Sequence, residues 1–274
     1  MSNLRDAATV LLLRDRPAGD FEVLMVKRHG QSGFMAGAHV FPGGKLDAAD
    51  SAPELTARLR GFDAAQAAHA LGETALAPEL ALGLFVAALR ETFEEAGVLL
   101  ADVSANQDLA AARRRLNEGT SFGQVLSELD ARLRVDQIVA FSRWITPVVE
   151  PRRFDTRFFL ARVEASQRAE HDAHETTEHA WLTPREAVDA TLRGEIMLPP
   201  PTLKSLLELS ELPTSQAALD MARSRKPPML CPVIEQIDGA LTILLPGDPL
   251  HPEPQAALAG TTRIVLENGR FFAR

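Results

Sequence analysis

The stretch RETFEEAGV at Arg90–Val98 says more about this chain than any other part of its sequence. It places three carboxylates, Glu91, Glu94 and Glu95, three and four residues apart, and helical pitch brings that spacing onto one face. Like charges so close repel each other unless a cation neutralises them, and a hard divalent cation with oxygen ligands would do so. Gly97 is typical of a helix end. A solvated acidic helix face is the alternative, and the stretch alone does not separate the two.

The length of the chain indicates one domain of ordinary size with insertions or an extension. The chain has 274 residues, of which 46% are hydrophobic, and a net charge of −8. The negative charge opposes non-specific nucleic-acid binding, because a phosphate backbone would be repelled. A single cysteine, Cys231, excludes an internal disulfide framework and is typical of a reducing cytoplasm. The N-terminal apolar run is short and broken by charges, so we expect neither a signal peptide nor a membrane span.

Strands and helices are expected to be mixed, without the regular alternation of a doubly wound sheet. Two strands at 8–13 and 21–28, joined by a turn with Pro17 and Gly19, predict a hairpin. Pro78 is predicted to open the helix that carries the glutamates and runs to Ala96. Further strands are expected at 138–146, 156–164 and 178–182, helices within 51–77 and 109–134, after Thr183-Pro184 and at 202–209, and hairpins at Asp238-Gly239 and Asn268-Gly269.

A glycine pair, Gly43-Gly44, precedes the glutamate helix. Because glycine has no Cβ, its backbone can approach an ion or a phosphate closely. An isolated Pro-Gly-Gly is most often an ordinary turn. Beside the glutamate stretch, the pair favours an ion or phosphate site.

FPGG at Phe41–Gly44 and RETFEEAGV together resemble the Nudix box, whose pattern is G-x5-E-x7-R-E-U-x-E-E-x-G-U, where U is a bulky apolar residue. The second half matches except at Thr92, where an apolar residue is usual. Gly44 begins the first half, and Asp50 stands where its first glutamate would be. An insertion at 51–78 then separates the two halves.

Several further segments resemble the peroxisomal coenzyme A diphosphatase branch of the Nudix hydrolases, the Nudix motif 19-type, and its bacterial relatives. They are GFMAGAHVFPGGKLDAAD at 33–50, WITP at 144–147, RRFDTRFFLA at 152–161 and LPPPTL at 198–203. The resemblance implies an α/β (α+β) Nudix fold, a mixed sheet sandwiched between helices. We expect a Nudix domain at 1–201, with a helical insertion at about 51–78 and a helical segment at about 102–135. A small C-terminal α/β extension at 202–274 would pack on it.

The resemblance implies metal-assisted hydrolysis of the diphosphate bond of a nucleoside diphosphate linked to another moiety, with Mg²⁺ or Mn²⁺. Coenzyme A or an acyl-coenzyme A would yield 3′,5′-ADP and a phosphopantetheine. ADP-ribose, NADH or a nucleotide sugar is the alternative substrate. The alternative of another class is a non-catalytic Nudix-like ligand sensor, but all three glutamates are present and no DNA-binding helix-turn-helix accompanies them.

By the same resemblance, the metal ligands lie on the glycine pair and the glutamate helix: the Gly44 carbonyl, Glu91, Glu94 and Glu95. Glu91 is the candidate general base, and Arg90 would orient Glu94 four residues on. Candidates for a further carboxylate from a later loop are Glu175 and Glu178, with Glu150 behind them, and for each a surface glutamate is the more common case.

Arginines are the candidate substrate contacts, because a planar guanidinium suits phosphate and coenzyme A carries an extra 3′-phosphate. Arg152, Arg153 and Arg157 form a basic cluster within an acidic chain, and pairing with nearby carboxylates is the alternative for them. Arg28, at the end of the second strand, is a similar candidate.

The expected partner is a small-molecule diphosphate, with no nucleic acid and no membrane, and a homodimer is left open. Met25 and Met35 are candidates for an acyl pocket, with core packing as the alternative. The chain ends Phe272-Ala273-Arg274, which is not a typical peroxisomal signal, so a cytoplasmic location is expected.

Overall fold

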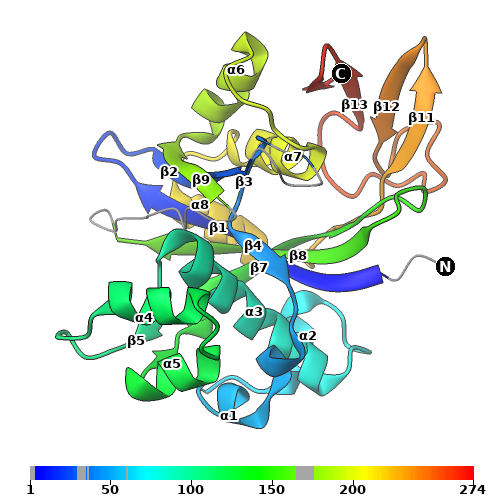
Figure 1. Ribbon diagram of the computed structural model, residues 1–274. Helices are drawn as coiled ribbons and strands as arrows, with labels where there is room; N and C mark the ends of the chain where they lie inside the picture. The colour runs from blue at the N-terminus through cyan, green and yellow to red at the C-terminus, as the bar shows by residue number, and fades with distance from the viewer. Residues whose placement is uncertain (1–3, 30–34, 36, 60, 165–175) are drawn as a thin grey trace.

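The centre of the molecule is a mixed β-sheet between two layers of helices (Figure 1). The computed structural model describes the chain except residues 1–3, 30–34, 36, 60 and 165–175. The strands of the main sheet are β1 (Leu4–Asp15), β2 (Phe21–Arg28), β3 (His39–Val40), β4 (Gly43–Lys45), β7 (Ile138–Ile145), β8 (Arg153–Val163), β9 (Thr176–Leu182) and β10 (Met229–Leu230). Their order is β10-β7-β8-β1-β2-β3, with β4 paired to β1 and β9 to β2. The expected fold class is confirmed.

Strand β1 is the centre of this sheet and pairs with three others. It forms the predicted antiparallel hairpin with β2 and runs parallel to β8 over its whole length. On its other partner, β4, the register sets Ala8 opposite Gly44 and Thr9 opposite Gly43. The glycine pair therefore lies in a short strand.

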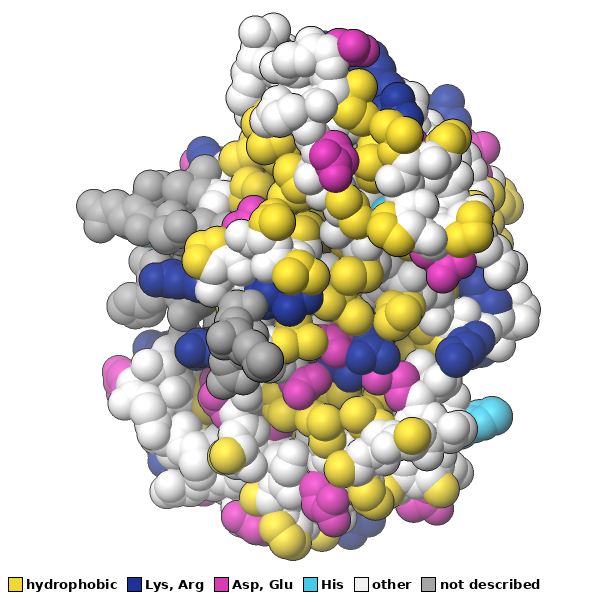
Figure 2. Space-filling view, turned by 90° about the vertical axis from the view of Figure 1, so that its right-hand side faces the viewer, with side chains coloured by type: hydrophobic (Ala, Val, Ile, Leu, Met, Phe, Trp, Pro, Cys, Tyr) yellow, Lys and Arg dark blue, Asp and Glu magenta, His cyan; other side chains and the backbone are white. Residues whose placement is uncertain are grey.

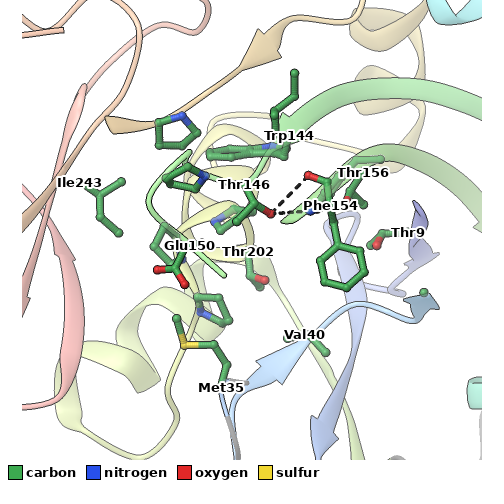
Figure 3. A pocket seen from close by; sticks show the side chains of 18 of the residues that line it. Thr9, Met35, Val40, Trp144, Thr146, Glu150, Phe154, Thr156, Thr202 and Ile243 are labelled. Carbon is green, nitrogen blue, oxygen red and sulfur yellow. Dashed lines mark hydrogen bonds between the residues drawn. The ribbon is translucent and has the colours of Figure 1, made fainter. Parts of the chain in front are cut away.

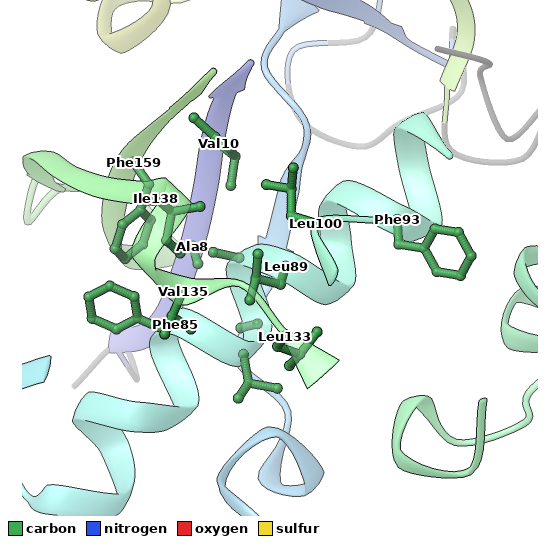
Figure 4. Packing of buried hydrophobic residues seen from close by; sticks show 14 of the residues in the cluster. Ala8, Val10, Phe85, Leu89, Phe93, Leu100, Leu133, Val135, Ile138 and Phe159 are labelled. Atoms are coloured by element: carbon green, nitrogen blue, oxygen red, sulfur yellow. The ribbon is translucent and has the colours of Figure 1, made fainter. Parts of the chain in front are cut away.

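One face of the sheet is covered by α3 (Pro78–Ala96), with α1 (Pro53–Thr56), α2 (Ala64–Leu71), α4 (Leu109–Asn117) and α5 (Phe122–Glu128) around it. Helix α3 begins and ends as predicted, with proline in the first turn and Gly97 in the left-handed conformation at its end. Side chains of a strand alternate between faces, so Ala8 and Val10 of β1 meet this layer. Figure 4 shows them beside Phe85 and Leu89 of α3.

The opposite face is covered by α6 (Pro184–Arg193), α7 (Pro200–Leu209) and α8 (Ser215–Arg223). The alternate side chains of β1, Leu11 and Leu13, pack in this second core together with Leu206 and Leu219 of the helices. Helix α8 was not predicted, although its sequence carries an N-cap residue. The Thr214 hydroxyl accepts a hydrogen bond from the Ala217 amide.

The insertion is helical as expected, but in short pieces. It contains α1 and α2, and the 3-10 helix η1 (Ala48–Ser51) precedes it. Asp63 caps α2 through a reciprocal pair of hydrogen bonds with Gln66, and Gly72 ends it with φ of 67°. The helical segment that follows α3 consists of α4 and α5, with Ser121 at the N-cap of α5. The short strands β5 (Ala101–Asp102) and β6 (Arg132–Leu133) flank it.

The C-terminal part ends in an antiparallel sheet of β11 (Val233–Ile237), β12 (Ala240–Leu244), β13 (Arg263–Glu267) and β14 (Arg270–Ala273). Both predicted hairpin turns are present, with Asp238 and Asn268 at positive φ ahead of their glycines. Helices α7 and α8 pack in the core beneath the main sheet, and β10 pairs with β7 in that sheet. The division of the chain at residue 201 stays a prediction. Among the described residues, no helix has the length and hydropathy needed to span a membrane.

Candidate metal centre and adjoining pocket

The glutamates of α3 are organised by one buried arginine. Arg90 is 7% exposed, and its Nη1 donates hydrogen bonds to Glu91 Oε1 at 2.9 Å and to Glu94 Oε2 at 2.7 Å. The contact with Glu94 confirms the expected pairing across one helical turn. The contact with Glu91 shows that the same guanidinium also fixes the neighbouring carboxylate.

Arg90 also closes the gap between the two halves of the split motif. Its Nε and Nη2 donate to the two carboxylate oxygens of Asp50 at 2.8 and 2.9 Å, a bidentate pair. A third bond runs from Nη2 to the Lys45 carbonyl at 2.9 Å. Burial alone would lower the pKa of Arg90, but the hydrogen bonds to Asp50 and the charge of Glu91 outweigh it and raise that pKa above its ordinary value.

Both glycines of the pair are required by close approaches. A Cβ on Gly43 would lie 2.4 Å from the Ala8 carbonyl oxygen, and one on Gly44 would lie 2.4 Å from Glu91 Oε1. The Gly43 amide donates to Glu95 Oε2 at 2.8 Å. Strand β4 therefore lies directly against the glutamate face of α3, with no side chain between them.

The carboxylate of Glu94 is only partly compensated. Burial raises its pKa, and the Arg90 charge acts against that rise but is shared with Asp50 and Glu91. A cavity of about 240 Å³ opens beside Glu94 and Arg90, lined also by Asp47, Asp50 and Glu54. An excess of negative charge thus faces a space that water can enter.

The donor chemistry at this place suits a hard divalent cation. Carboxylate and backbone carbonyl oxygens are the ligands such ions take, and the space at Gly44 is one that a Cβ would fill. Within the described residues, however, no group of three or more His, Cys, Asp or Glu side chains is arranged to hold a metal ion. Arg90 and the Gly43 amide hold the carboxylate oxygens instead. The residues fit a metal by type and position, and side-chain rotation would have to bring their oxygens together.

A second cavity, of about 260 Å³, is lined by Gly43 of the glycine pair (Figure 3). Its walls bring together the segments singled out in the sequence, with Gly43 of FPGG, Trp144–Pro147 and Pro199–Thr202 all lining it. Figure 3 shows Phe154 and Thr9 on one side and Ile243 of the C-terminal sheet on the other. Thr146 is fixed by two hydrogen bonds with the Phe154 backbone, of 3.0 and 3.2 Å.

Two residues of the cavity wall carry a buried donor atom that has no partner among the described residues. Trp144 is 4% exposed and its Nε1 makes no hydrogen bond, and neither does the buried Nε of Arg28. Both residues line the cavity. A buried donor without an acceptor is costly.

The candidate arginines are separated by the fold. Arg28 lies in the pocket wall at the end of β2. Arg152 is exposed, and the Arg153 Nε donates to the Thr146 carbonyl at 3.0 Å. Arg157 is only 3% exposed and is bound by Glu73 at 2.9 and 3.0 Å and by Asp6. The alternative of acidic pairing therefore describes Arg157, and substrate contact does not.

The candidates for a further carboxylate are equally dispersed. Glu175 lies outside the described residues. Glu178 is exposed in β9 and binds the Lys27 ammonium at 2.9 Å. Glu150 lines the cavity of about 260 Å³. Met35 is also in the pocket wall, whereas Met25 is fully buried in the core.

The fold is that of a Nudix hydrolase. The crystal structure of a NUDIX hydrolase from Alicyclobacillus acidocaldarius superposes with a TM-score of 0.66 at 27% identity, covering 80% of this chain and 97% of that one. The chain belongs to the family described as the NUDT19 Nudix domain, whose model matches residues 4–68 and 55–209. It is therefore an enzyme of the Nudix class, and hydrolases of this class use divalent metal ions.

Relatives in vertebrates cover nearly the whole chain. A Gallus gallus protein named acyl-coenzyme A diphosphatase NUDT19 is 32% identical over 91% of this chain and 80% of its own length. Its Homo sapiens and Xenopus laevis counterparts, with the same name, are each 29% identical and cover 95% and 91% of this chain. The matched regions span 82% of the Homo sapiens protein and 76% of the Xenopus laevis protein. The family resemblance seen in the sequence is confirmed.

Sequence reasoning missed two parts of the site. Asp50 was placed in the motif but not recognised as the bidentate partner of Arg90, a pairing that its motif position could have indicated. Ile234 and Ile243 in the pocket wall carried no signal, because their position depends on where the C-terminal sheet packs.

Proposed function

We propose that this enzyme hydrolyses the diphosphate bond of coenzyme A or an acyl-coenzyme A, giving 3′,5′-ADP and a phosphopantetheine or its acyl derivative. The observation that carries the proposal is the junction at Gly43, which touches the glutamate centre through Glu95 and also lines the apolar pocket. A substrate with a charged diphosphate and an uncharged arm matches such a junction. The names of the vertebrate relatives support the same substrate.

Mg²⁺ or Mn²⁺, held by the Gly44 carbonyl and by Glu91, Glu94 and Glu95, would neutralise the diphosphate and lower the pKa of attacking water. Glu91 is the proposed base and takes the water proton on its carboxylate. The water oxygen then forms a bond to phosphorus, and the bond from phosphorus to the bridging oxygen breaks. The leaving phosphate departs with that oxygen.

Arg90 acts as a positioning residue in this proposal. It holds Glu91 and Glu94 in fixed rotamers and is itself held by Asp50. Arg28 is the proposed phosphate contact, since it lines the pocket and its buried Nε has no partner among the described residues. The roles proposed for Arg152 and Arg153 are weaker contacts at the rim, and the proposed ligand role of Glu175 rests on its sequence position alone.

The test is a substrate panel measured with Mg²⁺ and with Mn²⁺. Coenzyme A, acyl-coenzyme A, NADH and ADP-ribose are compared by kcat/KM, with products separated by chromatography and the Glu94→Gln protein as the background control. We expect 3′,5′-ADP from coenzyme A or its acyl derivatives at the highest kcat/KM, and no turnover when the metal is chelated. Preference for ADP-ribose or NADH would replace the proposed substrate. Binding without turnover of any of the four would favour a ligand sensor.

A cytoplasmic location also belongs to the proposal, and the single cysteine supports it. A homodimer in solution is left open. Light scattering coupled to size-exclusion chromatography decides it, because a monomer has a mass near 29.8 kDa.

A further inference from the structure

We infer that the C-terminal sheet builds the far wall of a subsite for the neutral arm of the substrate, with Ile234 and Ile243 setting how long an arm is accepted. This inference rests on the proposed function, because it assigns one end of the proposed substrate to the pocket of about 260 Å³. The glycine pair marks the diphosphate end of that pocket, and β11 and β12 mark the other.

The two isoleucines form one continuous surface. Ile234 of β11 and Ile243 of β12 are directly opposite each other in the antiparallel register. Opposed residues in such a pair project from the same face of the sheet, with Cβ atoms about 5 Å apart. Both line the pocket; Ile243 is 7% exposed and Ile234 is half-buried. In Figure 2 hydrophobic side chains gather over the upper half of the face where this sheet lies.

The charges of the pocket favour a neutral occupant. Among its described lining residues only Arg28 and Glu150 are charged, and the rest are apolar side chains, threonines, prolines and a glycine. The nucleotide half of coenzyme A carries a 3′-phosphate, which needs several cationic donors and would be repelled by Glu150. The pantetheine arm and its thioester are uncharged and mostly aliphatic.

The unpartnered donors match the polar groups of that arm. Trp144 can only donate, through Nε1, and it lies in the wall next to Ile145 and Thr146. The pantetheine arm offers amide carbonyls, and an acylated arm adds a thioester carbonyl. An amide carbonyl that reaches Trp144 Nε1 would satisfy a buried donor that has no acceptor among the described residues.

The size of the cavity agrees with one arm. Pockets that enclose a whole drug-sized ligand measure roughly 300–1,000 Å³, and this one measures about 260 Å³. It therefore encloses part of a coenzyme-sized molecule, and the nucleotide half must lie outside it. An acyl chain would extend the arm from the glycine pair toward Ile234 and Ile243.

The first test compares Ile234→Phe with Ile237→Phe. Ile237 lies on the same strand, three residues on, and so projects from the opposite face. Using kcat/KM for coenzyme A, acetyl-coenzyme A and decanoyl-coenzyme A, we expect Ile234→Phe to lower the decanoyl-to-free ratio about tenfold. Ile237→Phe should leave that ratio unchanged. If Ile234→Phe does not fold, Ile234→Ala is the second variant. It enlarges the pocket and should raise the decanoyl-to-free ratio. An unchanged ratio in a folded Ile234 variant overturns the inference.

The second test reads the pocket without catalysis. Calorimetry without metal measures binding of S-hexanoyl-pantetheine and of 3′,5′-ADP to wild type and to Trp144→Phe, which keeps a ring and removes the donor. We expect Trp144→Phe to weaken the first about tenfold and leave the second unchanged. Loss of 3′,5′-ADP affinity alone, or no change in either, overturns the inference. If wild type binds the pantetheine probe but never cleaves coenzyme A, the proposed function fails while this assignment stands.

Discussion

Asp50 and Arg90 lie 40 residues apart in the chain and are joined by two parallel hydrogen bonds of 2.8 and 2.9 Å. Asp50 is 1% exposed and Arg90 is 7% exposed, so water competes little for either group. The pair brings β4 and α3 together although the insertion separates them in sequence. Through Arg90, the same pair also determines where the Glu91 and Glu94 carboxylates lie.

Replacing Asp50 with Asn should therefore damage both stability and activity. Removing one partner of a buried ion pair costs about 3 kcal/mol of unfolding free energy, because the other charge stays buried. Arg90 would then bind Glu91 and Glu94 more tightly, which should lower kcat. Urea denaturation and kcat measure the two effects. The control is Asp47→Asn, since Asp47 is 64% exposed and 3.8 Å from Arg90. Equal stability of the two variants would contradict the role given to Asp50.

Glu94→Gln and Glu95→Gln should lower kcat at least about a hundredfold, because each removes a proposed metal ligand. Thermal stability without metal should change little, since glutamine keeps an oxygen acceptor for the Arg90 and Gly43 donors. Glu79→Gln, exposed in the first turn of the same helix, is the matched control and should keep full activity. Wild-type kcat in either of the first two variants would reject the metal assignment.

Arg157→Met should unfold more easily, while KM of the folded fraction stays near wild type. The variant leaves Glu73 and Asp6 without their buried partner, at a cost of about 3 kcal/mol. Arg152→Met, at an exposed position, should change stability by less than about 0.5 kcal/mol. A rise in KM for Arg152→Met alone would support its role at the rim. A rise for a stable Arg157→Met protein would return Arg157 to the substrate site.

The C-terminal part should lose stability in acid through Asp248. This carboxylate is 3% exposed and accepts two hydrogen bonds from Arg263, both of 3.0 Å, which lower its pKa below the ordinary value of 3.8. A carboxyl with a lowered folded-state pKa contributes full stability above its unfolded pKa and loses that contribution as pH falls through the folded one. The wild-type melting temperature should therefore drop below pH 3.8, and less steeply in Asp248→Asn. Parallel melting curves for the two proteins across that range would contradict this.

Local patterns were sufficient to predict the glutamate helix, the hairpins and the split motif. Proline at the start of α3 and Gly97 at its end are signals within a few residues. The burial of Arg157 was not predictable from such local signals. It depends on the parallel register of β1 and β8, which sets Asp6 opposite Asp155 and so brings Asp6 within reach of Arg157. The same holds for Ile243, whose place in the pocket follows from long-range packing. For α8 the signal was present, since Thr214 precedes an amphipathic run.

Because Asp50 and Arg90 are joined directly, the positions of the glutamates do not depend on the number of residues between the two. Both ends of the insertion are anchored, with η1 and α1 packed on α3 at one end and α2 on the same helix at the other. Closing a flexible loop of twice the length costs only about 0.6 kcal/mol more. Lengthening an exposed turn within this segment should therefore cost little, whereas Leu55, Ala67 and Leu71 belong to the core and should tolerate little change. Such a turn could receive a foreign domain or a fluorescent reporter without moving the glutamates.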